Sequence, residues 1–338
     1  MRLYLDLGID LGTVNTRISR RGTGIILAEP TMVARSAGRI VAVGQAARQM
    51  AGRTPPGIEV IYPLKEGVIA DAEAATALLT ALVRRVRKGH RWQPLRLVLS
   101  TPLDVTDVER RALHETGHRL GARAVHLIEE PLAAAIGAGL AVAEAAGSLV
   151  VDIGAGTSEA AVIALGGFAA HQAVRIGGLH QDAAIVEYLR HQHQLLIGEL
   201  TAEAVKLAVG SAWAGAEPAA EMTVRGRDLR GGLPLAVRVT AGEIREAIAE
   251  PVSRLVELVR STLERTPPEL AADVISQGVW LTGGGALLPG LDQLIQHSVG
   301  VPVCVAPDAL NCVATGAAQV VEGVDRLRRP EPGRVARR

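Results

Sequence analysis

The chain has 338 residues, of which 48% are hydrophobic and 2% aromatic, and its 36 Lys and Arg nearly balance 35 Asp and Glu. A chain longer than about 250–300 residues is expected to form two domains or a bilobed unit. The balanced charge creates no overall field for nucleic acid or an anionic surface, and the few aromatic residues exclude the stacking platforms of a single-strand binder. We therefore predict no nucleic-acid partner.

The compartment follows from cysteine usage and from the absence of export signals. The two cysteines, Cys304 and Cys312, form no disulfide framework or four-ligand zinc site, and we interpret both as small core residues. The first residues lead directly into a strand pattern without the features of a signal peptide. Residues 133–153 are the most apolar stretch, but Glu144, Asp152 and several glycines interrupt it, whereas a membrane span needs about 20 apolar residues. We predict a cytoplasmic protein without a transmembrane helix.

One device occurs twice along the chain: an apolar strand, an Asp, a glycine turn with hydroxyl residues, and a second apolar strand. The first copy covers residues 7–18 and the second covers residues 149–163. Strand patterns bounded by a glycine turn predict hairpins, and two copies about 140 residues apart predict two related halves that face each other.

Helical and strand patterns alternate through the rest of the chain, which places the fold in the α/β class. The sequence predicts helices at residues 72–88, 108–120, from Glu130-Pro131 onward, 180–193, 201–211, 241–265 and 312–327. It predicts strands at 124–128 and 278–282, a turn-rich segment at 225–234, a helix after the triple glycine at 283–285, and a basic tail at the end of the chain.

The two hairpin turns carry the groups needed to bind phosphate. Backbone N–H groups in glycine turns form anion-binding concavities, here at Gly12, Thr13, Gly154 and Gly156. Asp10 and Asp152 precede these turns, and a carboxylate beside phosphate requires a cation between them. Mg²⁺ suits this position because it needs only one or two carboxylates besides water and phosphate oxygens. A single such turn would be an ordinary hairpin, whereas two matching copies favour a nucleotide site.

A third element follows the strand at residues 278–282. Thr282 leads into Gly283, Gly284 and Gly285, which permit a flat ligand to approach the backbone closely. Alone, this glycine run would be explained by helix–strand packing. Together with the two hairpins it completes a nucleotide site.

The segments 10–13, 152–157 and 282–285 resemble, in this order, the two phosphate motifs and the adenosine motif of the actin, heat-shock-70 and sugar-kinase superfamily. Within it, the chain resembles the MreB/Mbl family of bacterial actin homologues most closely, from about residue 7 to 320. The segments that carry this resemblance are 52–55, 67–71, 128–139, 196–199, 201–203, 224–229 and 266–273.

The resemblance implies an actin-like ATPase fold, with two duplicated ribonuclease-H-like domains around a nucleotide cleft and a smaller subdomain inserted in each. The implied boundaries are 1–30, 72–140 and 318–338 for subdomain IA, 31–71 for IB, 141–180 and 252–317 for IIA, and 181–251 for IIB. ATP and Mg²⁺ are the implied cofactors.

The resemblance also implies roles for individual residues. Asp10 and Asp152 would hold hydrated Mg²⁺, supported by Glu159 from outside the ion's direct contacts, while Glu130 and Thr157 would position the attacking water. The implied nucleotide contacts are Gly12, Thr13, Val14, Gly154, Ala155, Gly156 and Gly178 for the phosphates, Glu203 and Lys206 for ribose and adenine, and Gly283, Gly284, Gly285 and Ala286 for the adenosine loop. An alternative role for Glu130 is a favourable interaction with the helix macrodipole, and both roles are compatible.

Two residues depart from the family pattern. Ala155 replaces the middle glycine of the second phosphate turn, and Leu179 replaces an acid that follows the glycine pair 177–178. We therefore expect ATP binding with slow hydrolysis, and a nucleotide-binding scaffold without hydrolysis remains an alternative.

A basic loop at residues 87–94 contains Arg91 and Trp92, the composition of a membrane-interface anchor. The resemblance implies that this loop inserts into the membrane, whereas Trp92 as a partly buried cap is the alternative. Separately, residues 114–118 match the H-E-x-x-H zinc-protease motif, for which we favour a solvated helix face.

The resemblance implies an ATP-dependent, membrane-associated cytoskeletal filament that organises cell-wall synthesis and cell shape at the inner face of the cell membrane. Its partners would be further copies of the chain and membrane proteins of cell-wall synthesis. The alternatives are a sugar or acetate kinase, which would need a second substrate pocket, and a heat-shock-70-like chaperone, which would need a peptide-binding domain.

Overall fold

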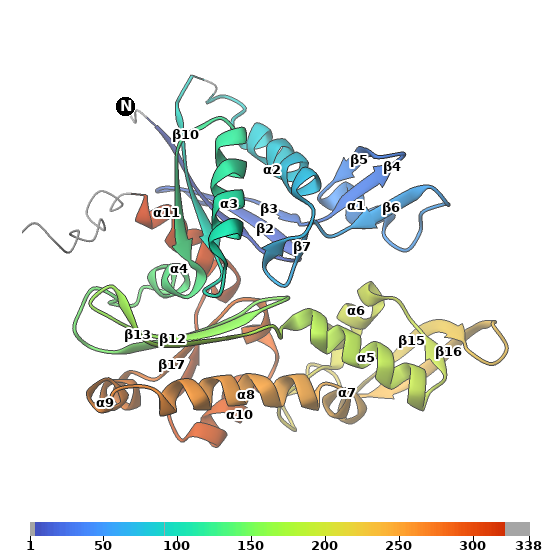
Figure 1. Cartoon of the computed structure of the whole chain (residues 1–338). Coiled ribbons are helices and arrows are strands. Elements are labelled where there is room, and N and C mark those ends of the chain that lie inside the picture. Colours follow the sequence, from blue (N-terminus) through green and yellow to red (C-terminus); the bar gives the residue numbers. More distant parts are fainter. Residues whose placement is uncertain (1–3, 91, 322–338) are drawn as a thin grey trace, which may run out of the picture.

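The computed structural model describes residues 4–90 and 92–321, which form two lobes built around two five-stranded sheets (Figure 1). The first sheet has the order β10-β9-β1-β2-β3, in which β1, β9 and β10 are parallel and β2 and β3 complete an antiparallel meander. Its strands are β1 (Leu5–Leu11), β2 (Asn15–Arg20), β3 (Gly24–Pro30), β9 (Leu95–Thr101) and β10 (Ala122–Glu129). The near-continuous apolar runs of β1 and β9 are typical of parallel strands that are buried on both faces.

The second sheet repeats this topology in the order β18-β17-β11-β12-β13, with β11, β17 and β18 parallel and β12 and β13 antiparallel. Its strands are β11 (Ser148–Ile153), β12 (Ser158–Ala164), β13 (Gly167–Val174), β17 (Val279–Thr282) and β18 (Val303–Val305). Asp10 and Asp152 are each the penultimate residue of the first strand in their sheet. The two predicted hairpins and the duplication are therefore confirmed.

Two helices are packed between the sheets and join the lobes. Helix α11 (Cys312–Val320) packs against β1, β2 and β9 of the first sheet, although the chain reaches it from the second lobe. Helix α4 (Glu130–Gly137) follows β10 of the first sheet and packs against β11 and β12 of the second. The two helices also pack along each other, where Gly137 and Gly316 leave no room for a side chain. Each half of the chain thus supplies a helix to the other half's sheet.

Further helices cover the outer faces of the lobes (Figure 1). They are α2 (Ala72–Val86) and α3 (Asp107–Arg119) on the first lobe, and α8 (Ala249–Glu264), α9 (Pro268–Gln277) and α10 (Leu291–Val299) on the second. Thr106 caps α3 in a reciprocal arrangement with Glu109, and Asp71 caps α2 by accepting from the N–H of Ala74.

Each lobe carries a smaller unit at the same end of the molecule (Figure 1). In the first lobe this unit contains β4 (Val33–Ser36), β5 (Arg39–Val43), α1 (Gln45–Met50) and β6 (Ile58–Ile61), followed by the short hairpin β7 (Leu64–Lys65) and β8 (Val68–Ile69). In the second lobe it contains α5 (Gly178–Gln192), β14 (Leu195–Leu196), α6 (Glu199–Val209), β15 (Glu221–Asp228), β16 (Pro234–Thr240) and α7 (Ala241–Ala247). The subdomain boundaries given above remain a prediction.

Two predicted elements differ from the structure. Residues 225–234 are not one turn-rich segment, because residues 225–228 pair in the hairpin of β15 and β16. The single helix predicted at 241–265 is interrupted at Ile248, because Pro251 has no N–H to donate to the preceding turn. The helix predicted after the triple glycine is present: a short 3-10 helix, Gly284–Leu287, is followed by α10 (Leu291–Val299), and a second 3-10 helix, Ala309–Asn311, precedes α11.

Cys312 is buried as predicted, but Cys304 is exposed on β18, so interpreting it as a core residue was wrong. The part of the predicted C-terminal helix after residue 321, and the basic tail, lie outside the described residues. Within the described ranges no helix combines the length and apolar character that a membrane crossing requires.

Candidate functional site

A cavity of about 540 Å³ lies between the lobes and receives residues from both repeated hairpins. All but two of the predicted site residues line it: Asp10, Gly12, Thr13, Val14, Glu130, Asp152, Gly154, Ala155, Gly156, Thr157, Gly178, Glu203, Lys206, Gly283, Gly284 and Gly285. Residues that lie up to 275 positions apart in the sequence are thus brought to one site by the duplicated fold.

The two hairpin turns have the same backbone geometry. The N–H of Gly12 donates to the carbonyl of Asn15 at 3.2 Å, and the N–H of Gly154 donates to the carbonyl of Thr157 at 2.9 Å. A Cβ atom on Gly12 would lie 2.8 Å from the carbonyl oxygen of Asn15, and one on Gly154 would lie 3.0 Å from that of Thr157. Both tight turns therefore require glycine at these positions.

A third turn, between β7 and β8, holds the hairpins together. The N–H of Gly67 donates to Thr13 Oγ1 at 3.1 Å. A Cβ atom on Gly156 would lie 2.9 Å from the same Oγ1 atom and 3.0 Å from the Cα atom of Glu66. The hairpins thus face each other across a gap that this turn closes on one side.

Carboxyl groups gather at this end of the cavity and titrate abnormally. Burial raises the pKa of Asp10 to about 7, and Asp152 raises it further while Arg17, 3.9 Å away, opposes the shift. Burial also raises the pKa of Asp152 to about 6, although Thr282 Oγ1 donates to its Oδ1 at 2.8 Å. The pKa of Glu130 lies well above its usual range because of burial and the neighbouring Glu159. Each negative charge here is unfavourable without a cation nearby.

The donor set of this carboxyl group cluster fits Mg²⁺. Among the described residues no cluster of three or more His, Cys, Asp or Glu side chains is arranged to hold a metal. Mg²⁺ nevertheless suits two carboxylates, because it retains several waters and takes further oxygens from phosphate. Asp10 and Asp152 are therefore the residues able to hold the ion.

Two predicted site residues lie behind the cavity wall. Glu159 is only 1% exposed, and its Oε1 accepts from the N–H of Leu103 at 2.8 Å, so it faces the carboxyl cluster from behind. Ala286 is 2% exposed and packs in the core of the second lobe. Neither residue lines the cavity.

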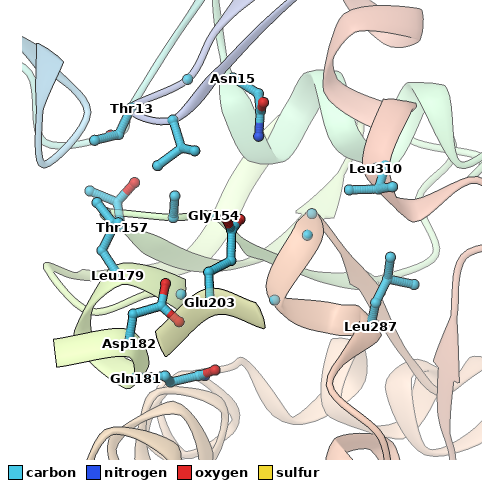
Figure 2. A pocket seen from close by; sticks show the side chains of 18 of the residues that line it. Thr13, Asn15, Gly154, Thr157, Leu179, Gln181, Asp182, Glu203, Leu287 and Leu310 are labelled. Atoms are coloured by element: carbon cyan, nitrogen blue, oxygen red, sulfur yellow. The ribbon is translucent and has the colours of Figure 1, made fainter. Parts of the chain in front are cut away.

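The two departures from the family pattern have different consequences. Four non-glycine residues in the described part of the chain have positive φ, and Ala155 is not among them, so its methyl group introduces no backbone strain. Leu179 lines the cavity beside Thr157 (Figure 2), where the family pattern would place a carboxylate. The N–H groups of Gly178 and Leu179 donate to the carbonyls of Gly154 and Ala155, which ties the start of α5 to the second hairpin.

The opposite end of the cavity is mainly apolar. Leu207, Leu287, Leu288, Pro289 and Leu310 line it together with the glycine run 283–285. Gly283 has φ +80°, and a Cβ atom there would lie 2.4 Å from the carbonyl oxygen of Ile153, so the run packs directly on the end of β11. This end suits a flat, apolar group such as a base.

Several charged residues of the cleft are already paired. Lys206 Nζ lies 2.8 Å from Asp182 Oδ1 and donates to the carbonyl of Gly178 at 2.7 Å. Arg48 of α1 and Glu203 of α6 form an ion pair of 2.6 Å that joins the two smaller units across the mouth of the cleft.

Sequence reasoning missed several residues that line the cavity. They include Asn15, Arg17, Tyr62, Gln181, Asp182, Glu199 and Leu310. Leu179 also lines the cavity, although the sequence identified it only as a departure from the family pattern. A signal existed for Gln181, because residues 181, 185 and 189 form a buried stripe with helical spacing on α5, and only the first of them is polar.

Two sequence features lie outside the cleft: the H-E-x-x-H match at residues 114–118, which forms no metal site within residues 4–90 and 92–321, and the loop that contains Trp92. The rings of His114 and His118 lie 5.0 Å apart, but Glu115 pairs with Arg119, and the described residues supply no third metal ligand there. Trp92 is 99% exposed, so its interpretation as a partly buried cap was wrong, while Arg91 lies outside the described residues.

Comparison with known proteins gives the same result as the fold. The family model for MreB/Mbl protein matches residues 4–329. Cell shape-determining protein MreB of Escherichia coli (strain K12) is 48% identical over 327 residues, covering 95% of this chain and 94% of the relative. Cell shape-determining protein Mbl of Bacillus subtilis (strain 168) is 43% identical over 324 residues, covering 95% and 97%. The crystal structure of MreB5 of Spiroplasma citri bound to AMPPNP is 34% identical, with a TM-score of 0.91 over 96% of this chain and 98% of that one.

The duplicated sheets, the exchanged helices and the cleft between the lobes define an actin-like protein. Within that class, the chain belongs to the MreB/Mbl family of cell-shape proteins.

Proposed function

We propose that this chain is an ATP-dependent, actin-like filament protein that lies at the inner face of the cell membrane and organises cell-wall synthesis and cell shape. One observation carries the proposal: two facing glycine hairpins, each with an Asp near the end of its first strand, line one cleft whose other end is apolar. The AMPPNP bound in the similar Spiroplasma protein supports the nucleotide part of it. The four-subdomain division given above belongs to the same proposal.

In this proposal the triphosphate lies between the hairpins and the base lies against the glycine run. Backbone N–H groups beside Gly12, Thr13, Gly154 and Gly156 bind the phosphates. Asp10 and Asp152 hold Mg²⁺, which neutralises phosphate charge when it is bound. Thr282 orients the carboxyl group of Asp152 for this contact through its 2.8 Å hydrogen bond.

Hydrolysis depends on Glu130 and Thr157. Glu130 begins α4 and lines the cleft, so its carboxylate can orient a water molecule once the cation lowers its pKa. Since the reaction relies on positioning and charge stabilisation rather than on covalent catalysis, we expect slow turnover. Phosphate release from the wild type and from Glu130→Ala tests this role, and equal rates would remove Glu130 from the mechanism.

A nucleotide-binding scaffold without hydrolysis is the second candidate, favoured by Leu179 in the cavity wall. The same assay distinguishes the two, because a scaffold releases no phosphate above a blank while it still binds ATP.

Self-association follows from closure of the cleft around ATP. Head-to-tail contacts that do not close into a ring produce filaments, as the family membership leads us to propose. Sedimentation of the pure protein with Mg-ATP, Mg-ADP and no nucleotide tests this step. Pelleting should require ATP, and monomers under every condition would contradict it.

Membrane attachment is proposed for the loop that presents Trp92. An aromatic ring that is 99% exposed beside basic residues suits the headgroup layer of anionic lipid. Because one ring binds weakly, attachment requires many subunits in a filament. We expect Trp92→Ala filaments to bind anionic vesicles several-fold less than wild-type filaments, while neutral vesicles bind neither. Equal binding of both filaments to anionic vesicles would show that this loop is not the membrane attachment site.

A further inference from the structure

The side-chain amide of Gln181 has no explanation in the fold. The residue lies in the first turn of α5 and is 1% exposed, yet its Nε2 atom has no hydrogen-bond partner among the described residues. Buried amide groups are nearly always hydrogen-bonded, and an unpaired one destabilises the protein. Gln181 also lines the cleft, so a ligand in the cleft can supply the missing partner.

The position of Gln181 indicates which part of a bound ligand the amide would contact. Figure 2 shows Gln181 on the far side of Glu203 and Asp182 from the hairpin residues Thr13 and Gly154. Apolar residues that belong to neither hairpin, Leu207, Pro218, Leu288 and Pro289, also line the cleft. A polar group of the ligand that enters this side of the cleft would therefore meet the amide in apolar surroundings.

The charged neighbours of Gln181 are already engaged with protein groups. Lys206 is held by Asp182 and the carbonyl of Gly178, and Glu203 is paired with Arg48. The amide is left with an unused donor, and an amide carries a donor and an acceptor side by side. This is the pattern that side-chain amides use to pair with adenine, accepting from its 6-amino group and donating to a ring nitrogen.

We propose that Gln181 binds the polar edge of a purine base and selects adenine through its 6-amino group. The pairing uses the 6-amino group and N7 of adenine, whereas the same edge of guanine carries two acceptors, O6 and N7, so the amide cannot satisfy both atoms there. The inference rests on the proposed nucleotide function and adds to it the residue that determines base specificity.

The test compares ATP with purine riboside triphosphate, which differs from ATP only by lacking the 6-amino group. Calorimetry should show that the wild type binds ATP about tenfold more tightly than this analogue, the effect of about one good hydrogen bond in a buried site. In Gln181→Met, which keeps the volume and removes the amide, the two triphosphates should bind with equal affinity, and no more tightly than the analogue binds the wild type.

Gln172→Met is the matched control. Gln172 on β13 also has a buried Nε2 without a partner in the described part of the chain, but it does not line the cleft. Both variants should unfold at a higher temperature than the wild type without nucleotide, since each removes an unpaired polar group. Only Gln181→Met should lose the preference for ATP.

Several results would overturn the inference. Equal affinity of the wild type for the two triphosphates would exclude recognition of the amino group without any variant. An unchanged ATP preference in Gln181→Met would assign the recognition to another residue. If the wild type bound neither triphosphate, the proposed function would fail and this inference with it.

Discussion

The crossing of α4 and α11 gives the sharpest stability prediction, because backbone packs directly on backbone there. A Cβ atom added at Gly316 would lie 1.9 Å from the carbonyl oxygen of Ala133, where ordinary contacts begin at 3.4 Å. The variant Gly316→Ala must therefore separate the two helices by about 1.5 Å or distort one of them.

The magnitude combines two opposing effects. Replacing a helical glycine with alanine stabilises a helix by about 1 kcal/mol, whereas overpacking a tight contact costs about 1–3 kcal/mol, with rigid backbone at the upper end. We expect a net loss of about 2 kcal/mol. With an unfolding entropy of about 2.1 cal/mol/K per residue, a chain of 338 residues should unfold about 3 °C lower.

Thermal unfolding monitored by circular dichroism measures this shift, and Gly242→Ala is the matched control. Gly242 is also helical, but its nearest atoms are 3.9 Å away, so this variant should gain stability from helix propensity. The two alanines should therefore shift the midpoint in opposite directions. If Gly316→Ala unfolded at or above the wild-type temperature, close packing at this crossing would not hold the lobes together.

Two further variants test the cleft. Arg48→Ala removes the ion pair with Glu203 across the cleft mouth. Because a partly exposed pair contributes about 0.2–1 kcal/mol, nucleotide should dissociate up to about fivefold faster in stopped-flow experiments. The control is Arg254→Ala, whose pair with Glu250 lies on the surface of α8; an equal increase in its dissociation rate would show that the Arg48–Glu203 pair does not specifically retain nucleotide. Ala155→Gly should change ATP affinity less than about twofold by calorimetry, since Ala155 has no positive φ and its neighbours already accommodate the methyl group, whereas a large gain would show that the methyl group obstructs phosphate.

The duplicated fold could be predicted because each hairpin is encoded locally. The sequence around Asp10 and around Asp152 contains the strand, the acid and the glycine turn within a few residues, so both hairpins were visible without any long-range information. Pro251 is also a local signal, because a proline inside a helical pattern breaks the helix, but the apolar pattern of residues 241–265 predicts one helix where the structure has α7 and α8.

The base end of the cleft was harder to predict, because its residues come from distant segments. Leu207, Pro218 and Leu310 carry no local motif, and only the closing of the second lobe brings them together. The exchange of α4 and α11 between the sheets is also a tertiary property, although the small residues of both helices are consistent with it. Gln181 was overlooked because a single polar residue in an apolar stripe is visible only once the stripe is known to be buried.

Isothermal titration of the pure protein with ATP tests most directly whether two facing hairpins and their acids bind one magnesium-bound triphosphate. The wild type should take up one ATP per chain in the presence of Mg²⁺, and either chelation of Mg²⁺ or Asp152→Asn should weaken binding at least about tenfold, because each leaves phosphate charge without its counter-ion. No uptake by the folded wild type, or uptake that neither change affects, would contradict the account.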